Sequence, residues 1–377
     1  MKKLAFIWDN FGPTHVDRCE AVAQKFAGRK EVIGVELAGK SIVYGWKPEN
    51  GVTFRKITLM PGRPIEEIPL VERLYKTLRI CLSMGMQTDI FICNYQHLAT
   101  LIASSILRLL GFRVYAMGCS KFDDYPRKLY RENLKKIFYL PYCGGIASGK
   151  RSRDYMRFLG LSAKKVKAEY NTVSVSRIRG LAGAPPAPGG LPFSKRHFTI
   201  VARFVPTKNL SMALKAFASY AAQVTNPRPL HLCGAGPLEV ELRQQAHDAG
   251  IEHLVHFRGF LQTAAVCETL ASTLVLLLPS IEEQFGNVVP EALAMGLPVV
   301  LSENCGARDL LVRSGVNGFV IEPDNPDGMA YFMKMLAEDE ALWSRMCLAS
   351  QQFCERGDAG LFAEAVEALV FRRGDEA

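Results

Sequence analysis

The chain has 377 residues, 49% of them hydrophobic and 22% charged, which is long enough for two domains with ample cores. No stretch reaches the roughly 18 to 20 apolar residues of a membrane-spanning helix. The apolar run in the first residues, MKKLAFIWDN, is too short for a signal peptide. These features exclude an integral membrane protein and predict a globular protein with a net charge of +9.

The ten cysteines are scattered and none forms a CxxC pair, so a structural zinc site is not expected. Thiols flanked by apolar residues fit a reducing compartment. We therefore expect a cytoplasmic protein without a structural zinc site.

Short apolar strands alternate with amphipathic helices through the first half of the chain. Strands are expected at 1–8, 31–37, 52–57, 89–94, 112–117, 144–148 and 166–171. Helices are expected after the loop 10–15 and at 70–81, 98–110, 126–140 and 152–159. This alternation predicts an α/β domain with a parallel sheet.

Several polar residues follow the strands of this first half. Gly12 and His15 lie in the loop after the first strand, the first crevice position of a doubly wound sheet. Gly12 lets a ligand approach the backbone, although the loop has no G-x-G-x-x-G pattern. His15 could contact a phosphate or an acceptor, but a lone histidine near a helix start is more often a capping residue. His97 follows the strand 89–94, and Asp124 lies in the polar loop 118–127.

The positive charge is concentrated between Lys121 and Lys167, where 13 Lys and Arg face 4 Asp and Glu. Within this segment the expected helix 126–140 is basic and also carries aromatic and aliphatic residues. A basic stripe suits an anionic membrane surface or a charged substrate, while a solvated helical face explains the charge equally well.

Residues 180–192, GLAGAPPAPGGLP, form the sharpest change of composition in the chain. We predict a first domain at 1–183, a linker at 184–192, a second domain at 193–357 and a final helix at 358–377. The second domain repeats the alternation of strands and helices, so it too is predicted to hold a parallel sheet.

A strand, a loop and a short helix follow one another in PSIEEQFGNVVPEALAMGLP, residues 279–298. Glu283 lies in the loop at the carboxyl end of the apolar strand, and Glu291 lies in the first helical turn. The backbone N–H groups around Gly286 to Val288 suit an anion. Two carboxylates beside an anion site predict a sugar nucleotide, whose hydroxyls and diphosphate match these groups. A capping glutamate with a solvated loop glutamate is the simpler alternative.

This stretch resembles the E-x7-E signature of retaining glycosyltransferases, in particular glycosyltransferase family 4 (glycosyl transferases group 1). The resemblance covers nearly the whole chain and is strongest from 198 to 321. It implies the GT-B fold, in which two Rossmann-like domains face a central cleft and the last helix, 358–377, packs back on the first domain. It also implies retention of the sugar's configuration, no metal requirement and no cofactor, with the nucleotide sugar as co-substrate.

The resemblance assigns roles to individual residues. Arg203 and Lys208 match the cations that hold the donor diphosphate, and Glu283 matches the carboxylate near the donor sugar. The implied donor-binding residues are Gly12, Gly234, Gly236, Arg258, Phe260, Phe285, Gly286, Asn287, Val288 and Glu291.

The first half departs from the family pattern. Gly118-Cys119-Ser120 stands where many relatives have a histidine, and Ser174 stands where an aspartate is usual. Because that histidine is missing, other residues of the first half are the candidates for the acceptor side. These are His15 and His97, with Asp124 as an alternative catalytic carboxylate.

The sequence thus predicts an enzyme that moves a sugar from a nucleotide-diphosphate donor to an acceptor hydroxyl. The expected acceptor is a glycan or a lipid-linked molecule in cell-envelope polysaccharide or glycolipid biosynthesis. Peripheral attachment to the inner face of the cytoplasmic membrane is part of this hypothesis, and no nucleic-acid partner is expected. A sugar-nucleotide epimerase of GT-B type and a non-catalytic nucleotide-binding paralogue are the alternatives.

Overall fold

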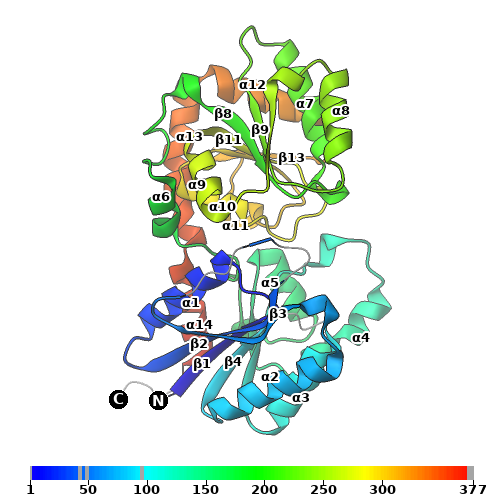
Figure 1. Cartoon of the computed structure of the whole chain (residues 1–377), viewed down its shortest axis with the longest axis vertical. Coiled ribbons are helices and arrows are strands. Elements are labelled where there is room, and N and C mark those ends of the chain that lie inside the picture. The colour runs from blue at the N-terminus through cyan, green and yellow to red at the C-terminus, as the bar shows by residue number, and fades with distance from the viewer. Residues whose placement is uncertain (1, 41–44, 47–50, 94–96, 372–377) are drawn as a thin grey trace. The chain divides into compact units, whose positions relative to one another are not determined.

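The chain forms two compact units, which we describe separately (Figure 1). The structure is a computed structural model that describes all residues except 1, 41–44, 47–50, 94–96 and 372–377. Unit 1 comprises Met1–Ser174 and Ala359–Ala377, and unit 2 comprises Val175–Asp358.

Unit 1 is built on a seven-stranded parallel sheet in the order β3-β2-β1-β4-β5-β6-β7. Its strands are β1 (Lys2–Trp8), β2 (Lys30–Lys40), β3 (Arg55–Pro64), β4 (Thr88–Ile92), β5 (Arg113–Gly118), β6 (Gly144–Ala147) and β7 (Val166–Lys167). The order reverses between β1 and β4, so this point at the carboxyl edge is where open sheets of this type bind ligands.

Helices cover both faces of this sheet. They are α1 (Pro13–Lys25), α2 (Leu70–Met84), α3 (Leu98–Leu109), α4 (Leu129–Tyr139), α5 (Gly149–Phe158) and α14 (Ala359–Val370). Alternate residues of β1 point to opposite faces: Ala5 and Ile7 pack with α2 and α3, whereas Leu4 and Phe6 pack with α1 and α14. The strands are buried on both faces, which explains their nearly continuous apolar sequences.

Unit 2 holds a six-stranded parallel sheet in the order β10-β9-β8-β11-β12-β13. Its strands are β8 (His197–Val201), β9 (Leu230–Cys233), β10 (Val255–Gly259), β11 (Thr273–Leu278), β12 (Val299–Ser302) and β13 (Gly318–Ile321). Its helices are α6 (Val175–Ala182), α7 (Leu210–Ala222), α8 (Glu239–Asp248), α9 (Thr263–Ala271), α10 (Val288–Ala294), α11 (Arg308–Leu311), α12 (Pro326–Glu338) and α13 (Glu340–Phe353). Figure 1 shows α7 and α8 on one side of the sheet and α9 and α10 on the other. The predicted α/β architecture with two parallel sheets is confirmed.

Three local predictions differ from the structure. The strand expected at 52–57 corresponds to β3, which begins at Arg55 and runs to Pro64. The strand expected at 166–171 ends at Lys167, and the following residues form a loop that carries Tyr170 and Asn171. The helix α6 precedes the proline-rich segment and was not predicted, because Gly180 lies within its eight residues.

The proline-rich segment predicted as a linker is bonded to unit 2. The N–H of Ala187 donates to the carbonyl of Met295 at 2.8 Å, and the side chain of Gln351 donates to the carbonyl of Ala187 at 2.6 Å. The buried Arg196 donates to the carbonyls of Gly189 and Leu191 at 2.6 and 2.9 Å. These bonds fix residues 187–191 within unit 2, which begins at Val175.

In the part of the chain that the structure describes, no helix has both the length and the apolar character needed to cross a bilayer.

Candidate active site

The loops at the carboxyl edge of the unit 2 sheet are joined by backbone hydrogen bonds. After β8, the carbonyl of Thr207 accepts from the N–H of Ile281 after β11 at 2.9 Å. Asn209, at φ 57°, donates from its amide to the carbonyls of Pro279 and Pro323 at 3.1 and 2.6 Å. These bonds hold the two loops together, so Lys208 on one loop lies next to Glu283 on the other.

Gly234 and Gly236 lie beneath this edge, where the loop after β9 crosses the loop after β8. A Cβ on Gly234 would lie 1.8 Å from the carbonyl oxygen of Ala202, and one on Gly236 would lie 2.5 Å from that of Phe204. Contacts this close leave no room for a side chain. The spacing G-x-G therefore reflects two close backbone approaches.

Lys208 and Glu283 form an ion pair, and their side chains are 17% and 13% exposed. The hydroxyl of Ser280 donates to the same carboxylate oxygen of Glu283 at 3.4 Å. Arg203 lies in the same loop as Lys208 and is exposed. The structure therefore brings two of the three predicted catalytic residues of this unit into direct contact.

The turn before α10 presents free backbone donors. Gly286 has φ 94°, and a Cβ there would lie 2.8 Å from the side chain of Leu278. The carbonyl of Phe285 accepts from the N–H of Ala307 at 2.9 Å, which fixes the turn. Among the described residues, the N–H groups of Phe285, Gly286 and Asn287 have no hydrogen-bond acceptor. Three such donors beside Lys208 are suited to an anion.

The remaining donor-side residues of unit 2 lie around this turn and at the end of β10. Val288 is buried at the start of α10, and Glu291 is partly exposed in its first turn. Arg258 is exposed near the end of β10, and Phe260, just beyond it, is 47% exposed. The N–H of Gly234 donates to the carbonyl of Gly259 at 2.8 Å, which ties the ends of β9 and β10 together.

In unit 1, Gly12 and His15 cap helix α1. The N–H of Gly12 donates to Nδ1 of His15 at 2.9 Å, and the imidazole stacks on Trp8 with ring centroids 4.5 Å apart. Burial, followed by the cations Arg18 and Lys56, holds the pKa of His15 well below its ordinary value. The imidazole is therefore neutral at pH 7. This agrees with the hydrogen bond from Gly12, because Nδ1 can accept it only when that nitrogen carries no proton.

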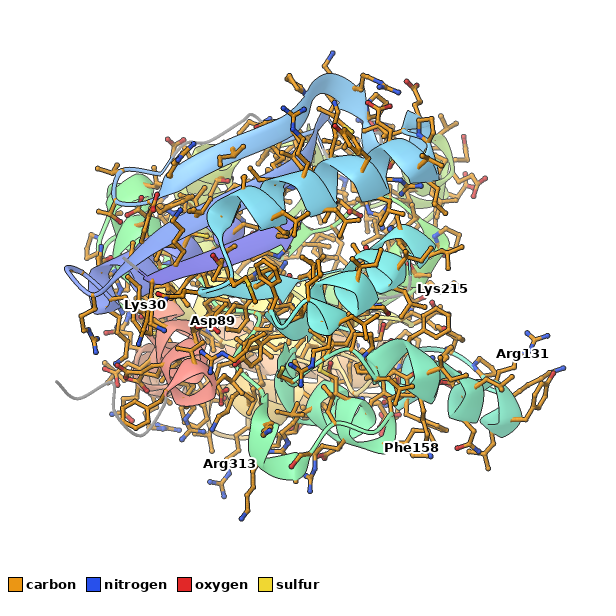
Figure 2. The ribbon with its side chains drawn as sticks, turned by 90° about the horizontal axis from the view of Figure 1, so that it is seen from below. Lys30, Asp89, Arg131, Phe158, Lys215 and Arg313 are labelled. Atoms are coloured by element: carbon orange, nitrogen blue, oxygen red, sulfur yellow. The ribbon has the colours of Figure 1, made fainter. Side chains whose placement is uncertain are left out.

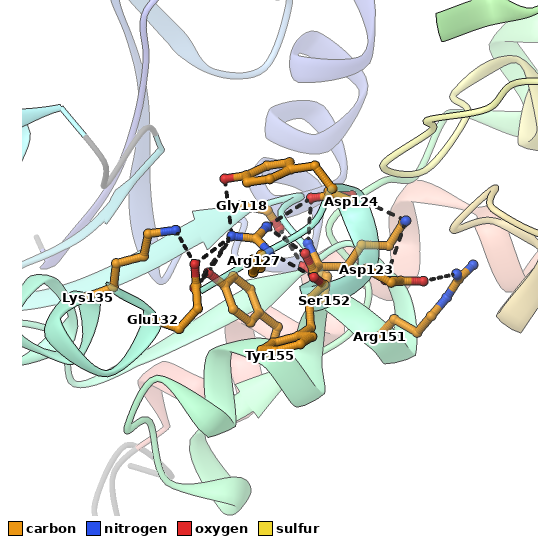
Figure 3. A network of polar contacts seen from close by, with 12 residues as sticks. Gly118, Asp123, Asp124, Arg127, Glu132, Lys135, Arg151, Ser152 and Tyr155 are labelled. Atoms are coloured by element: carbon orange, nitrogen blue, oxygen red, sulfur yellow. Dashed lines mark hydrogen bonds and ion pairs between the residues drawn. The ribbon is translucent and has the colours of Figure 1, made fainter. Parts of the chain in front are cut away.

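His97 and Asp124, the other predicted residues of unit 1, differ in their surroundings. His97 precedes α3, is partly exposed, and has Nδ1 3.7 Å from a carboxylate oxygen of Asp9. Asp124 is 6% exposed, and its carboxylate accepts from the backbone N–H of Lys121 at 2.9 Å (Figure 3). The side chains of Lys121 and Arg127 pair with it at 3.3 and 3.5 Å. These contacts give Asp124 a structural role, and its catalytic role stays a prediction.

Two buried cations of unit 1 were not singled out from the sequence. Lys121 is 1% exposed and pairs with Asp123 and Asp124. Arg18 is 1% exposed, stacks 4.5 Å from the centre of the Tyr170 ring and donates to Asn171 at 3.5 Å. Arg18 shares the apolar face of α1 with Val22, one turn away. The sequence could have indicated a special role for Arg18, because a cation on the apolar face of a helix is unusual.

Among the described residues, no group of three or more His, Cys, Asp or Glu side chains could hold a metal ion. The charged groups at the edge of unit 2 are instead a paired lysine and glutamate, an exposed arginine and backbone N–H donors. This set can bind a diphosphate through the cations and N–H groups, and hydroxyls through the carboxylates.

We compared the chain with protein families and with known sequences. Residues 187–352 match the model of the family Glycosyl transferases group 1. An uncharacterized glycosyltransferase of Methanocaldococcus jannaschii is 33% identical over 110 residues, 29% of this chain and 28% of that protein. The N-acetylgalactosamine-N,N'-diacetylbacillosaminyl-diphospho-undecaprenol 4-alpha-N-acetylgalactosaminyltransferase of Campylobacter jejuni is 24% identical over 363 residues, 91% of this chain and 92% of that protein. The chain spans little more than a quarter of the first of these relatives and nearly all of the second.

Solved structures resemble the whole chain. HepE of Anabaena, in a complex with UDP and glucose, superposes with a TM-score of 0.71 at 18% identity, over 97% of this chain and 98% of that one. A glycosyltransferase from Rickettsia africae superposes with a TM-score of 0.73 at 13% identity, over 98% and 99%. Residues 187–352 therefore belong to the glycosyl transferases group 1 family, and the chain has the fold of GT-B glycosyltransferases.

Proposed function

We propose that this protein is a retaining glycosyltransferase that moves a sugar from a nucleotide-diphosphate sugar to an acceptor hydroxyl. One observation carries the proposal. The Lys208–Glu283 ion pair lies in the same loop cluster as the three backbone N–H groups of Phe285, Gly286 and Asn287, which have no acceptor among the described residues. A diphosphate can accept hydrogen bonds from the N–H groups and pair with Lys208, while the hydroxyls of an attached sugar can donate to Glu283.

The donor's diphosphate binds Arg203, Lys208 and the three N–H groups, and its sugar lies at Glu283. Glu291 accepts from the ribose hydroxyls, and Arg258 and Phe260 flank the base. UDP-hexoses are the first donors to test, because HepE of Anabaena, which shares the fold, was crystallised with UDP and glucose.

In the transfer step, the bond between C1 of the sugar and the phosphate oxygen breaks, and a bond from C1 to the acceptor oxygen forms on the same face. The acceptor's proton passes to the departing phosphate oxygen. Arg203, Lys208 and the N–H groups stabilise the negative charge that develops on the diphosphate. These groups are fixed before the reaction, so the step needs no metal in this proposal.

The acceptor is a lipid-linked or envelope glycan, and the enzyme works while attached to the inner face of the cytoplasmic membrane. Two observations support this. A relative aligned over 91% of this chain is named for a diphospho-undecaprenol acceptor. The 13 Lys and Arg between Lys121 and Lys167 lie in unit 1 and attract an anionic surface.

A donor panel tests the proposal. UDP-, GDP- and ADP-sugars are first compared by thermal shift, because a ligand at about 100 times its dissociation constant stabilises by about 2.7 kcal/mol. The donor that binds is then incubated with EDTA and a lipid-linked acceptor, and the anomeric configuration of the product is read by NMR. A product with inverted configuration contradicts retention, and an epimerised sugar nucleotide identifies an epimerase. No binding of any donor contradicts the proposal as a whole.

Variants separate the two glutamates. Glu291→Ala should mainly raise the donor KM, because a ribose contact is present in both the ground and the transition state. Glu283→Ala should mainly lower kcat. The reverse pattern would exchange their roles.

A further inference from the structure

Helix α4 (Leu129–Tyr139) is turned so that most of its apolar side chains face solvent, while Phe138 and Tyr139 pack on the core of unit 1. Tyr130, Leu134 and Ile137 are 59%, 61% and 57% exposed, and Leu129 and Leu140 are 60% and 76% exposed. The only residues of this helix that are buried are Glu132 and Tyr139. A helix on the surface of a globular protein normally has the opposite orientation.

The buried side of α4 is held by charges. Glu132 is 2% exposed and accepts from the hydroxyl of Tyr155 at 2.5 Å (Figure 3). Arg127 pairs with Glu132 at 3.4 Å and also donates to the hydroxyl of Tyr155 at 2.9 Å. Lys135 completes the group, 2.8 Å from Glu132. The orientation of the helix is thus fixed by specific bonds, and rolling the apolar residues inward would break them.

The exposed apolar residues form one stripe. Tyr130, Leu134 and Ile137 follow the spacing i, i+4, i+7, which places them on one face of a helix. Phe122 and Tyr125, in the segment before the helix, add side chains that are 46% and 51% exposed. The segment that leads into α4 therefore also carries exposed aromatic side chains.

Cations border this stripe on both sides. At about 100° per residue, Arg131 and Lys135 lie along one edge of the stripe and Lys136 along the other. Figure 2 shows Arg131 pointing away from the protein, and its guanidinium donates to the hydroxyl of Tyr130 at 3.2 Å. The single acidic residue of α4 is the buried Glu132. The outer surface of the helix thus offers apolar and positive groups and no negative one.

We propose that α4 inserts its apolar stripe into an anionic lipid bilayer, with Tyr130, Leu134 and Ile137 below the headgroups. An apolar face flanked by basic residues is the pattern of helices that lie in the plane of a membrane interface. This inference rests on the proposed function for its setting. The proposed function explains membrane attachment by the basic residues alone. Here the apolar side chains insert into the bilayer, and the basic residues attract the anionic headgroups.

A second pair of exposed apolar residues, on α2 of unit 1, has different charged neighbours from those of α4. On α2, Val71 and Tyr75 are 73% and 59% exposed and are also four residues apart. Their neighbour Glu72 is partly exposed, where it pairs with Arg63 and Lys76. That surface is electrically mixed, whereas the exposed surface of α4 complements a negative bilayer.

Vesicle binding of the full chain tests the proposal. The protein is sedimented with vesicles of phosphatidylcholine alone or with phosphatidylglycerol added, at low and at high salt. Leu134→Ser with Ile137→Ser should weaken binding at least about ten-fold at both salt concentrations, because each lost side chain removes apolar burial. Replacing Lys128, Arg131, Lys135 and Lys136 with Gln should weaken binding at low salt only. It should leave the residual binding that the parent shows at high salt.

A matched control is Val240→Ser with Leu348→Ser, two exposed apolar residues on α8 and α13 of unit 2 that are 79% and 54% exposed. This variant should sediment like the parent. If the α4 variant also sediments like the parent, or the parent binds neither kind of vesicle, the insertion is wrong. If the parent is a dimer that the α4 substitutions separate, the stripe is an interface between copies and the proposal is also wrong.

Binding of UDP-glucose by thermal shift is measured on the same samples. A chain that binds vesicles through α4 but binds no sugar nucleotide keeps this inference and loses the proposed function. A chain that binds the donor but no vesicle keeps the proposed sugar transfer and loses both the membrane attachment and this inference.

Discussion

The carboxyl edges of the two sheets are organised in different ways. In unit 2 the loops are held by backbone contacts: Gly234 and Gly306 leave no room for a Cβ, which would lie 1.8 and 2.0 Å from neighbouring carbonyl oxygens. In unit 1 the loop after β5 is held by side-chain charges, with Lys121, Asp124 and Arg127 buried together. A close backbone contact requires glycine at one position, whereas a buried group of ion pairs can be formed by different charged residues at different positions. The first kind of edge is therefore the easier one to recognise in a sequence.

The largest expected effect comes from the backbone-held edge. Gly234→Ala would force a Cβ against the carbonyl of Ala202, at a residue with φ 152°. We expect a loss of about 4 kcal/mol in the free energy of unfolding, a size reserved for severe steric or backbone conflicts. Urea unfolding of the full chain measures it. Gly250→Ala, with φ 68° and open space around the Cβ, is the matched control and should cost about 1 to 2 kcal/mol. Equal losses in the two variants would mean that the close approach is not decisive.

The charge-held edge gives the next effect. Asp124→Ala leaves Lys121 and Arg127 buried without their carboxylate, which we expect to cost about 3 kcal/mol of stability. If Asp124 is structural, kcat with a saturating acceptor should change little in the fraction that remains folded. A large fall in kcat with unchanged unfolding would make it a catalytic carboxylate. Asp154→Ala serves as the control, because that side chain is 56% exposed.

At the donor site, Lys208→Ala should weaken use of the donor by about 1.5 to 3 kcal/mol, the range for a hydrogen bond to a charged group. The measurement is kcat/KM for the donor, and Arg203→Ala should behave alike. Lys215→Ala, an exposed lysine on α7, is the control. Unchanged kinetics in both site variants would remove these cations from the site.

The smallest effect concerns acid. His197 and His231 stack in unit 2 with ring centroids 3.6 Å apart, and burial lowers their pKa to about 4 and about 3. The unfolded chain binds protons at these residues near pH 6.5, and the folded chain binds them only at lower pH. Stability is therefore fully present above pH 6.5 and falls as the pH drops toward 4. His231→Phe should flatten this decline in urea unfolding at pH 7.5, 5.5 and 4.5. A decline of the same slope in this variant would place its origin elsewhere.

The same contrast explains what the sequence revealed. The strands, most helices and the residues around Glu283 and Gly286 follow from apolar periodicity and from glycines at fixed spacing. The orientation of α4 does not, because its apolar residues have the same spacing whether they face the core or solvent. Only the buried bonds of Glu132 with Arg127 and Tyr155 decide between the two. The partners of Arg18, Tyr170 and Asn171, lie in a distant segment of the chain, so its position on the apolar face of α1 marks it as unusual but does not identify them. Lys121 pairs with the nearby Asp123 and Asp124, but the spacing of these residues does not show that the group is buried.

The last helix has a consequence for synthesis of the chain. Phe362 and Val366 of α14 are fully buried in the core of unit 1, beside Val22 of α1. On the ribosome, residues 175–358 must be made before this helix exists, which takes about 10 to 40 s at ordinary rates of translation. Unit 2 then has its complete sequence while the face of the unit 1 sheet with Phe6 and Phe91 is covered by α1 and still lacks α14. The nascent chain therefore exposes part of this aromatic face for about half of its synthesis, and we expect a chaperone to bind there.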